Sequence, residues 1–166
     1  MLDLNHRRTD WPLGGRNALR SCALLLLLTM LAAMGAAAVP RAEPTVEELK
    51  SRVSSANVGE RPRLCVEIAQ KQLNATDKLY QTDDVAKAQA ALTDVVAFSE
   101  LARDYAIQSH KRQKETEIAV RVMARRLSDM LHLLGHEEQV PVRNAVNRLQ
   151  RVRDDLLMAM FPQGGR

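Results

Sequence analysis

The 166-residue sequence predicts an all-α protein, an antiparallel four-helix bundle preceded by a short N-terminal helix. Three observations support this fold class. Apolar residues recur at steps of three and four from about residue 62 onward, which is the spacing of one face of an α-helix. Glycine and proline fall where helices should start or stop. No stretch of useful length alternates between apolar and polar residues as a half-buried strand would, so strands are not expected.

The first 38 residues are expected to be a signal peptide. Four arginines precede an apolar run that starts at Cys22, and small residues follow, ending in Ala36-Ala37-Ala38. Basic, apolar and small-residue segments in this order are typical of a Sec-type secretion signal, here with cleavage after Ala38. The alternative is an uncleaved anchor, because the stretch 22–39 has 18 residues, near the lower limit of roughly 17–25 for a membrane-spanning helix.

Cleavage after Ala38 would leave residues 39–166, a length of 128 residues that suits one domain. These residues carry 20 Lys and Arg against 18 Asp and Glu, so the mature chain is only mildly basic. This charge balance, together with few aromatic side chains, argues against nucleic acid as a partner. The protein is therefore expected in the periplasm or outside the cell, or, as the alternative, anchored to the inner membrane by residues 22–39.

One cysteine, Cys65, remains after the expected cleavage. A lone cysteine cannot form a disulfide within the mature chain, even in an oxidising compartment. Because Cys65 lies on an apolar helical stripe, burial as a small apolar side chain is the favoured interpretation. The alternative is an intermolecular disulfide, which would make the protein a homodimer.

A short helix and a linker are expected in residues 39–60. Thr45 can cap this helix, and Glu48 follows three residues later and can bond back to the cap, which is the pattern of a capping box. The apolar residues of the helix share one side, and they are Val46, Leu49 and Val53.

The bundle is assigned to residues 61–161, and residues 162–166 to a disordered tail. Its first helix is expected to begin near Pro62, since proline is tolerated in the first turn of a helix, and to run to about Tyr80. A short turn over residues 81–84 ends in residues that favour the N-cap position, so the next helix should follow at once.

The later bundle helices show the a/d pattern of coiled coils and of helices packed at shallow angles. Gly135 is expected to end the third bundle helix as a C-cap, and Pro141 to begin the fourth. Helices of roughly 20–25 residues, about 30–37 Å long, match in length as an antiparallel bundle requires. The predicted stripes are Cys65, Ile68, Ala75 and Leu79, with the neighbouring stripe Val66, Ala69, Leu73 and Tyr80; Val85, Ala88, Leu92, Val95, Ser99, Ala102 and Ala106; Val120, Met123, Leu127, Met130 and Leu134; and Val142, Ala145, Leu149, Val152, Leu156 and Ala159.

The connection between the second and third bundle helices has two interpretations. Residues 108–117 carry no apolar side chain, yet they contain neither glycine nor proline. A continuous helix would join two helical hairpins through a rod of about 50 residues, near 75 Å long, with a polar middle. Such residues are good helix formers, which supports this alternative. A turn is favoured because it lets all four apolar faces meet, with Ser109 or Thr116 helping to cap the helix ends.

No catalytic motif is present in the sequence. It lacks a nucleophile elbow, a glycine-rich phosphate loop and a Ser-His-Asp order. His132 and His136 have the i, i+4 spacing of a metal-binding pair, but Gly135 falls between them and the H-E-x-x-H order is missing. Methionine and histidine are haem ligands in some bundles, and the candidates are Met123, Met130, Met158, Met160 and His132, although methionine at helical spacing is more often core filler. Hence no catalytic, cofactor-binding or metal-binding residue is assigned, and no small-molecule substrate is evident.

A basic face remains as a candidate interaction surface. Lys114, Arg121 and Arg125 fall on nearly one side of the third bundle helix. This face can meet an acidic partner or an anionic envelope surface, although an ordinary solvated helix face is the favoured interpretation. The sequence therefore predicts a small exported, non-enzymatic binding, scaffold or chaperone-like module of the cell envelope. The alternative is a metal- or haem-binding helical bundle.

Overall fold

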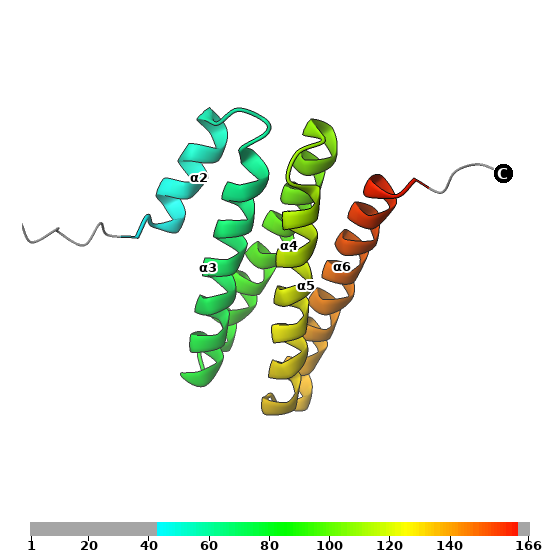
Figure 1. The fold of residues 1–166 in the computed structure, drawn as a ribbon. Helices are drawn as coiled ribbons and strands as arrows, with labels where there is room; N and C mark the ends of the chain where they lie inside the picture. Colours follow the sequence, from blue (N-terminus) through cyan, green and yellow to red (C-terminus); the bar gives the residue numbers. More distant parts are fainter. Residues whose placement is uncertain (1–42, 163–166) are drawn as a thin grey trace, which may run out of the picture. The chain divides into compact units, whose positions relative to one another are not determined.

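The computed structural model describes residues 43–162, and this range is all-helical, without a β-strand (Figure 1). The predicted signal peptide of residues 1–38, the alternative anchor of residues 22–39 and residues 163–166 of the predicted tail lie outside this range. Among the described helices, none is long and apolar enough to cross a membrane. The elements are α2 (Val46–Ser55), α3 (Arg61–Gln81), α4 (Val85–Ser109), α5 (Gln113–Met130), the 3₁₀ helix η2 (Leu131–Leu133) and α6 (His136–Met160).

Helix α2 begins with the predicted capping box. The Glu48 backbone N–H donates to Thr45 Oγ1 at 3.2 Å, and the Thr45 N–H donates to Glu48 Oε2 at 2.8 Å. Two backbone donors that the helix leaves unpaired are thereby satisfied. The buried side chain of Leu49 then packs against Leu64 and Ile68, so α2 covers the first half of α3.

Helices α3 and α4 form a hairpin whose ends follow the sequence prediction. Pro62 stands in the first turn of α3, where its missing N–H removes no helical hydrogen bond. The chain reverses at Asp83, which has a left-handed backbone with φ 59°. Asp84 then caps α4, because its carboxylate accepts the Lys87 N–H at 3.4 Å.

The polar stretch between α4 and α5 contains the favoured turn and not a continuous helix. His110 and Arg112 reverse the chain with left-handed backbones, φ 53° and 58°, that glycine would adopt more easily. Ser109 Oγ accepts the Lys111 N–H at 3.3 Å, within the turn. The proposed capping role of Thr116 is wrong, because its buried hydroxyl donates to the Arg112 carbonyl at 2.7 Å instead of accepting a backbone N–H.

The junction between α5 and α6 differs from the prediction. Helix α5 ends at Met130 and continues as η2, so Gly135 is not its C-cap. Gly135 has an extended backbone (φ −63°, ψ 158°) and is the N-cap of α6, with its N–H donating to Glu138 Oε2 at 3.0 Å. Pro141 consequently lies inside α6 and does not start it. This proline has no N–H to donate to the carbonyl four residues earlier, so the second turn of α6 has one backbone hydrogen bond fewer.

The two hairpins, α3–α4 and α5–α6, pack so that α4 contacts α6 and α3 contacts α5 (Figure 1). Neighbours are antiparallel within each hairpin. Between hairpins they run in the same direction, because the side-chain hydrogen bonds that cross the junction join residues 48 to 52 positions apart. The pairs are Glu60–Arg112, Asn74–Arg126, Asp77–Arg126, Glu100–Arg148 and Arg103–Asp155.

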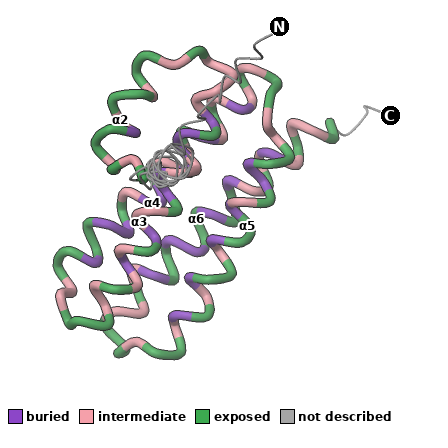
Figure 2. The backbone as a smooth tube through the Cα atoms, turned by 60° about the vertical axis from the view of Figure 1, so that its left-hand side comes forward, coloured by how far each residue is buried: buried purple, intermediate pink, exposed green. Residues whose placement is uncertain are grey.

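The inner faces of α3 to α6 form a continuous apolar core (Figure 2). The predicted stripes of α4, α5 and α6 are buried at nearly every position, including Leu92, Leu127 and Leu149. In α3 the predicted stripes are buried in part: Ala69 and Leu73 are buried, whereas Ala75 and Leu79 are only half-buried. The buried position between them is Thr76, whose hydroxyl donates to the Gln72 carbonyl at 2.8 Å.

Candidate functional site

The histidines singled out in the sequence do not share a helix. His132 lies in η2 and His136 is the first residue of α6, and both are exposed. The N-cap Gly135 separates them, so the i, i+4 geometry of a metal-binding pair does not form. Within residues 43–162, no group of three or more His, Cys, Asp or Glu side chains is placed to hold a metal ion.

The methionines divide between core and surface. Met123 and Met130 are buried in the apolar cluster, Met160 is half-buried, and Met158 is 61% exposed beside a charged groove. Cys65 is a free thiol with no exposed surface, as the favoured interpretation predicted. Burial raises its pKa to about 11, so the thiol stays protonated and a poor nucleophile near neutral pH.

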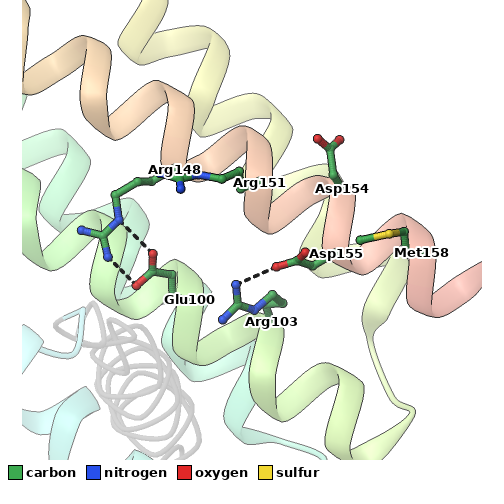
Figure 3. Close-up of a pocket in the computed structure, with 7 residues that line it drawn as sticks. All are labelled: Glu100, Arg103, Arg148, Arg151, Asp154, Asp155 and Met158. Carbon is green, nitrogen blue, oxygen red and sulfur yellow. Dashed lines mark hydrogen bonds and ion pairs between the residues drawn. The ribbon is translucent and has the colours of Figure 1, made fainter.

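A hollow of about 530 Å³ lies between α4 and α6, and nearly all of its lining is charged (Figure 3). Arg148 holds Glu100 through two hydrogen bonds, Nε to Oε1 at 3.0 Å and Nη2 to Oε2 at 2.7 Å. Arg103 Nη1 donates to Asp155 Oδ2 at 2.8 Å. Burial opposes the charge of Arg103, but its ion pairs with Asp104 and Asp155 outweigh burial and raise its pKa.

These two ion pairs connect one hairpin to the other, and they involve most of the charged residues that line the α4–α6 hollow. In Figure 3, Asp155 points toward Arg103 across the hollow, whereas Asp154 projects away from it. Forked guanidinium–carboxylate contacts have a defined geometry. The hollow is therefore organised mainly to hold α4 against α6.

A second groove, of about 380 Å³, lies between α5 and α6. We call it the arginine groove, because its polar lining includes three arginines and no acidic residue. It is lined by Arg121, Ala124, Arg125 and Ser128 from α5 and by Leu149, Gln150 and Arg153 from α6. Arg121 and Arg125 belong to the basic face that the sequence indicated, and the structure adds Arg153 from the neighbouring helix.

Glu117 of α5 contacts two of these arginines, Arg121 and Arg153. Its side chain is only 9% exposed, and its Oε1 accepts a hydrogen bond from Arg153 Nε at 2.9 Å. Arg121 Nε lies 3.6 Å from the same oxygen. Both guanidinium groups thus face one carboxylate through Nε, and among the described residues their terminal nitrogens have no hydrogen-bond partner. The arrangement leaves a net positive charge at the groove.

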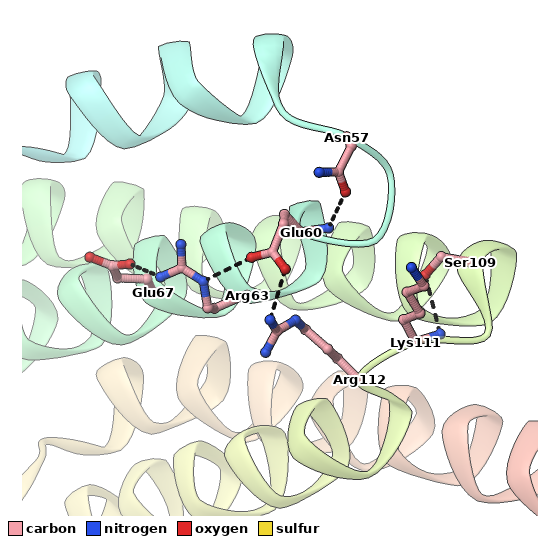
Figure 4. Close-up of polar contacts among 7 residues, drawn as sticks. All are labelled: Asn57, Glu60, Arg63, Glu67, Ser109, Lys111 and Arg112. Carbon is pink, nitrogen blue, oxygen red and sulfur yellow. Dashed lines mark hydrogen bonds and ion pairs between the residues drawn. The ribbon is translucent and has the colours of Figure 1, made fainter.

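Two other arginines near the arginine groove in sequence, Arg112 and Arg126, have structural partners. Arg112 Nη2 donates to Glu60 Oε1 at 2.8 Å, and Arg63 Nε donates to Glu60 Oε2 at 3.3 Å (Figure 4). The hydrogen bonds from Arg112 and then Arg63 lower the pKa of Glu60. Arg126 donates hydrogen bonds to the side chains of Asn74 and Asp77 of α3. These contacts attach α5 to α3 and remove Arg112 and Arg126 from the candidate surface.

In the sequence, Glu117 is expected only to balance the charge of the basic face, and Arg153 is not indicated at all. Glu117 belongs to a run without apolar residues, so nothing marked it as buried. Arg153 lies 36 positions away, and only the antiparallel pairing of α5 with α6 brings the two together. The helical phase of α5, which places Glu117 four residues before Arg121, was the one signal available.

No protein-family model matches the chain, and comparisons with curated proteins and with solved structures found no match.

Proposed function

We propose that the protein is a non-enzymatic binding or scaffold module of the cell envelope that engages a partner through the arginine groove. Helices α3 to α6 are proposed to act as one four-helix bundle built of two antiparallel hairpins. Support for this arrangement comes from the contacts of α3 with α4 and α5, and of α6 with α4 and α5. The bundle then serves as a rigid support for surface side chains.

The observation that carries the proposal is the unused hydrogen-bonding capacity of the groove. The terminal nitrogens of Arg121 and Arg153, and the whole guanidinium of Arg125, have no hydrogen-bond partner within residues 43–162. Arginine forks of this kind bind carboxylates and phosphates in protein interfaces. The α4–α6 hollow supports binding less well, because two of its three arginines, Arg103 and Arg148, already pair with Asp155 and Glu100.

Export to the periplasm or the cell exterior is part of the proposal and rests on the signal-like residues 1–38. Mass analysis of the protein isolated from its own compartment should give a mature N-terminus at Val39. A chain that retains residues 22–39 would instead indicate a tethered module.

Site-specific photo-crosslinking tests the binding function. A photoreactive amino acid replaces Gln150, which lines the arginine groove, and the matched control replaces Arg52, an exposed residue of α2. A discrete adduct from Gln150, absent from the Arg52 control, is expected in intact cells. Equal adducts from both positions, or none from either, would contradict a role for the groove.

The alternative of a metal- or haem-binding bundle is separated by elemental analysis and a visible spectrum of the same purified protein. A stoichiometric metal or a Soret band would favour that alternative over the binding module.

A further inference from the structure

We propose that the arginine groove binds an acidic segment of a partner protein, with its carboxylates placed along α5. This inference rests on the proposed binding function and gives the chemistry of the partner.

The positive charges form a row, not a single point. Lys114, Arg121 and Arg125 share one face of α5, and Lys114 and Arg125 are 11 residues apart. At 1.5 Å per residue the row extends over about 16 Å. A single small anion would occupy one position in such a row, whereas a segment with several carboxylates can occupy all of it.

The groove is built to keep its guanidinium groups in place. Arg121 Nε and Arg153 Nε both approach Glu117 Oε1, at 3.6 and 2.9 Å, so the two cations are held close together across the groove. One carboxylate cannot neutralise two guanidinium groups, and Arg125 adds a third charge. An incoming carboxylate would accept hydrogen bonds from the free terminal nitrogens and reduce the repulsion between the arginines.

The uncharged residues of the groove favour a polypeptide over a lipid surface. Gln150 and Ser128 supply polar atoms on its two walls, and the apolar side chain Leu149 is fully buried below them. Beside the row, the exposed apolar residues of α5 are Ile118 and Val122, at 40% and 59% exposure. Membrane-surface helices use Trp, Phe and Leu to enter the bilayer, and none of these is exposed on α5. A short apolar and acidic segment complements this surface.

The test is direct binding of a fluorescein-labelled hexaglutamate peptide to the mature protein, followed by fluorescence anisotropy at low ionic strength. The test variant is Arg121→Gln with Arg125→Gln, which leaves the Glu117–Arg153 pair intact. The matched control removes two positive charges elsewhere, by Arg52→Gln with Lys78→Gln on α2 and α3, where neither side chain has a hydrogen-bond partner within residues 43–162. We expect the groove variant to bind at least about tenfold more weakly and the control to bind as wild type does.

Four results would overturn the inference. The first is absence of peptide binding to the wild-type protein, and the second is equal weakening by the control pair, which would mean non-specific attraction. The third is binding to phosphatidylglycerol vesicles that depends on Arg121 and Arg125 while the peptide does not bind, which would assign the groove to a lipid. A photo-crosslinked partner at Gln150 that persists in the groove variant would retain the binding function but reject an acidic segment as its ligand.

Discussion

Removing the Arg153 guanidinium should destabilise the fold, because Glu117 would remain as a buried carboxylate without its close partner. Arg153→Met keeps most of the apolar stem of the side chain and removes only the charged head. The carboxylate would then have Arg121, 3.6 Å away, as its nearest cation.

The expected loss in the free energy of unfolding lies between the values for breaking a fully buried ion pair and a surface ion pair. Removing one partner of a fully buried pair costs about 3–5 kcal/mol, and an exposed pair contributes about 0–1 kcal/mol. Glu117 is 9% exposed but Arg153 is 40% exposed, and Arg121 remains nearby. We therefore expect a loss of about 1–3 kcal/mol in the free energy of unfolding. For a domain of this size that lowers Tm by about 4–12 °C.

Circular dichroism during thermal and urea unfolding measures this loss. Adding Glu117→Gln to Arg153→Met should recover much of it, because the charge left without a partner is also removed. The control is Arg143→Met on the same helix, where the side chain is exposed and its contact with Gln139 is long, 3.4 Å. Two results would refute this expectation: an Arg153→Met variant with the same Tm as the wild type, or a double variant that is less stable than the single one.

Three further predictions concern the core, the α4–α5 turn and the buried thiol. Leu127→Asp, at a position with no exposed surface, should abolish cooperative unfolding, because an unpaired buried charge costs several kcal/mol against a total of about 5–15 kcal/mol. His110→Gly should raise Tm by a few degrees, because glycine removes the strain of φ 53° at this helix end. Because burial raises the pKa of Cys65 to about 11, its contribution to stability is complete below pH 9 and is lost as the pH rises toward 11. Urea unfolding across this range should show a smaller decrease for Cys65→Ala.

Each of these predictions has a contradicting result. A Leu127→Asp variant that melts as wild type does would place that side chain in solvent. A lower Tm for His110→Gly would show that the histidine side chain stabilises the turn. An identical alkaline decrease in Cys65→Ala would assign the effect to other groups, such as Tyr80, whose pKa is also raised by burial and by Glu138.

The helices could be predicted from the sequence because their determinants are local. The capping box of Thr45 and Glu48, the first-turn Pro62 and the N-cap Asp84 each act within one helical turn. The three-four spacing likewise placed Leu127 and Leu149 in the core. Such signals need no knowledge of the remaining chain.

Other features depended on competition between signals. Gly135 and Pro141 are both typical of helix boundaries, and the sequence predicts a helix end at Gly135 and a helix start at Pro141. In the structure, Glu138 bonds back to the Gly135 N–H and starts the helix before the proline. Similarly, the turn after α4 uses left-handed His110 and Arg112 in place of glycine, which no composition rule indicates.

The candidate site was only half visible in the sequence, because it is made by two helices. Periodicity grouped Arg121 with Arg125, but the direction in which α6 passes α5 decides that Arg153 completes the groove. Periodicity also could not show that α4 and α6 run in the same direction, because an amphipathic stripe does not determine the chain direction of the helix packed against it.

The hydrogen bonds between the two hairpins join residues that are far apart in sequence, at a nearly constant separation. This has a consequence for folding kinetics. Each hairpin closes through a short connection, residues 82–84 between α3 and α4 and residues 131–135 between α5 and α6, so its contacts are local and can form quickly. The pairs Glu100–Arg148 and Arg103–Asp155 instead join distant parts of the chain and require both hairpins to be in place. Contacts that form after the folding transition state act mainly on the rate of unfolding. We therefore expect these ion pairs to slow unfolding of the assembled protein, and the short turns to determine how fast it folds.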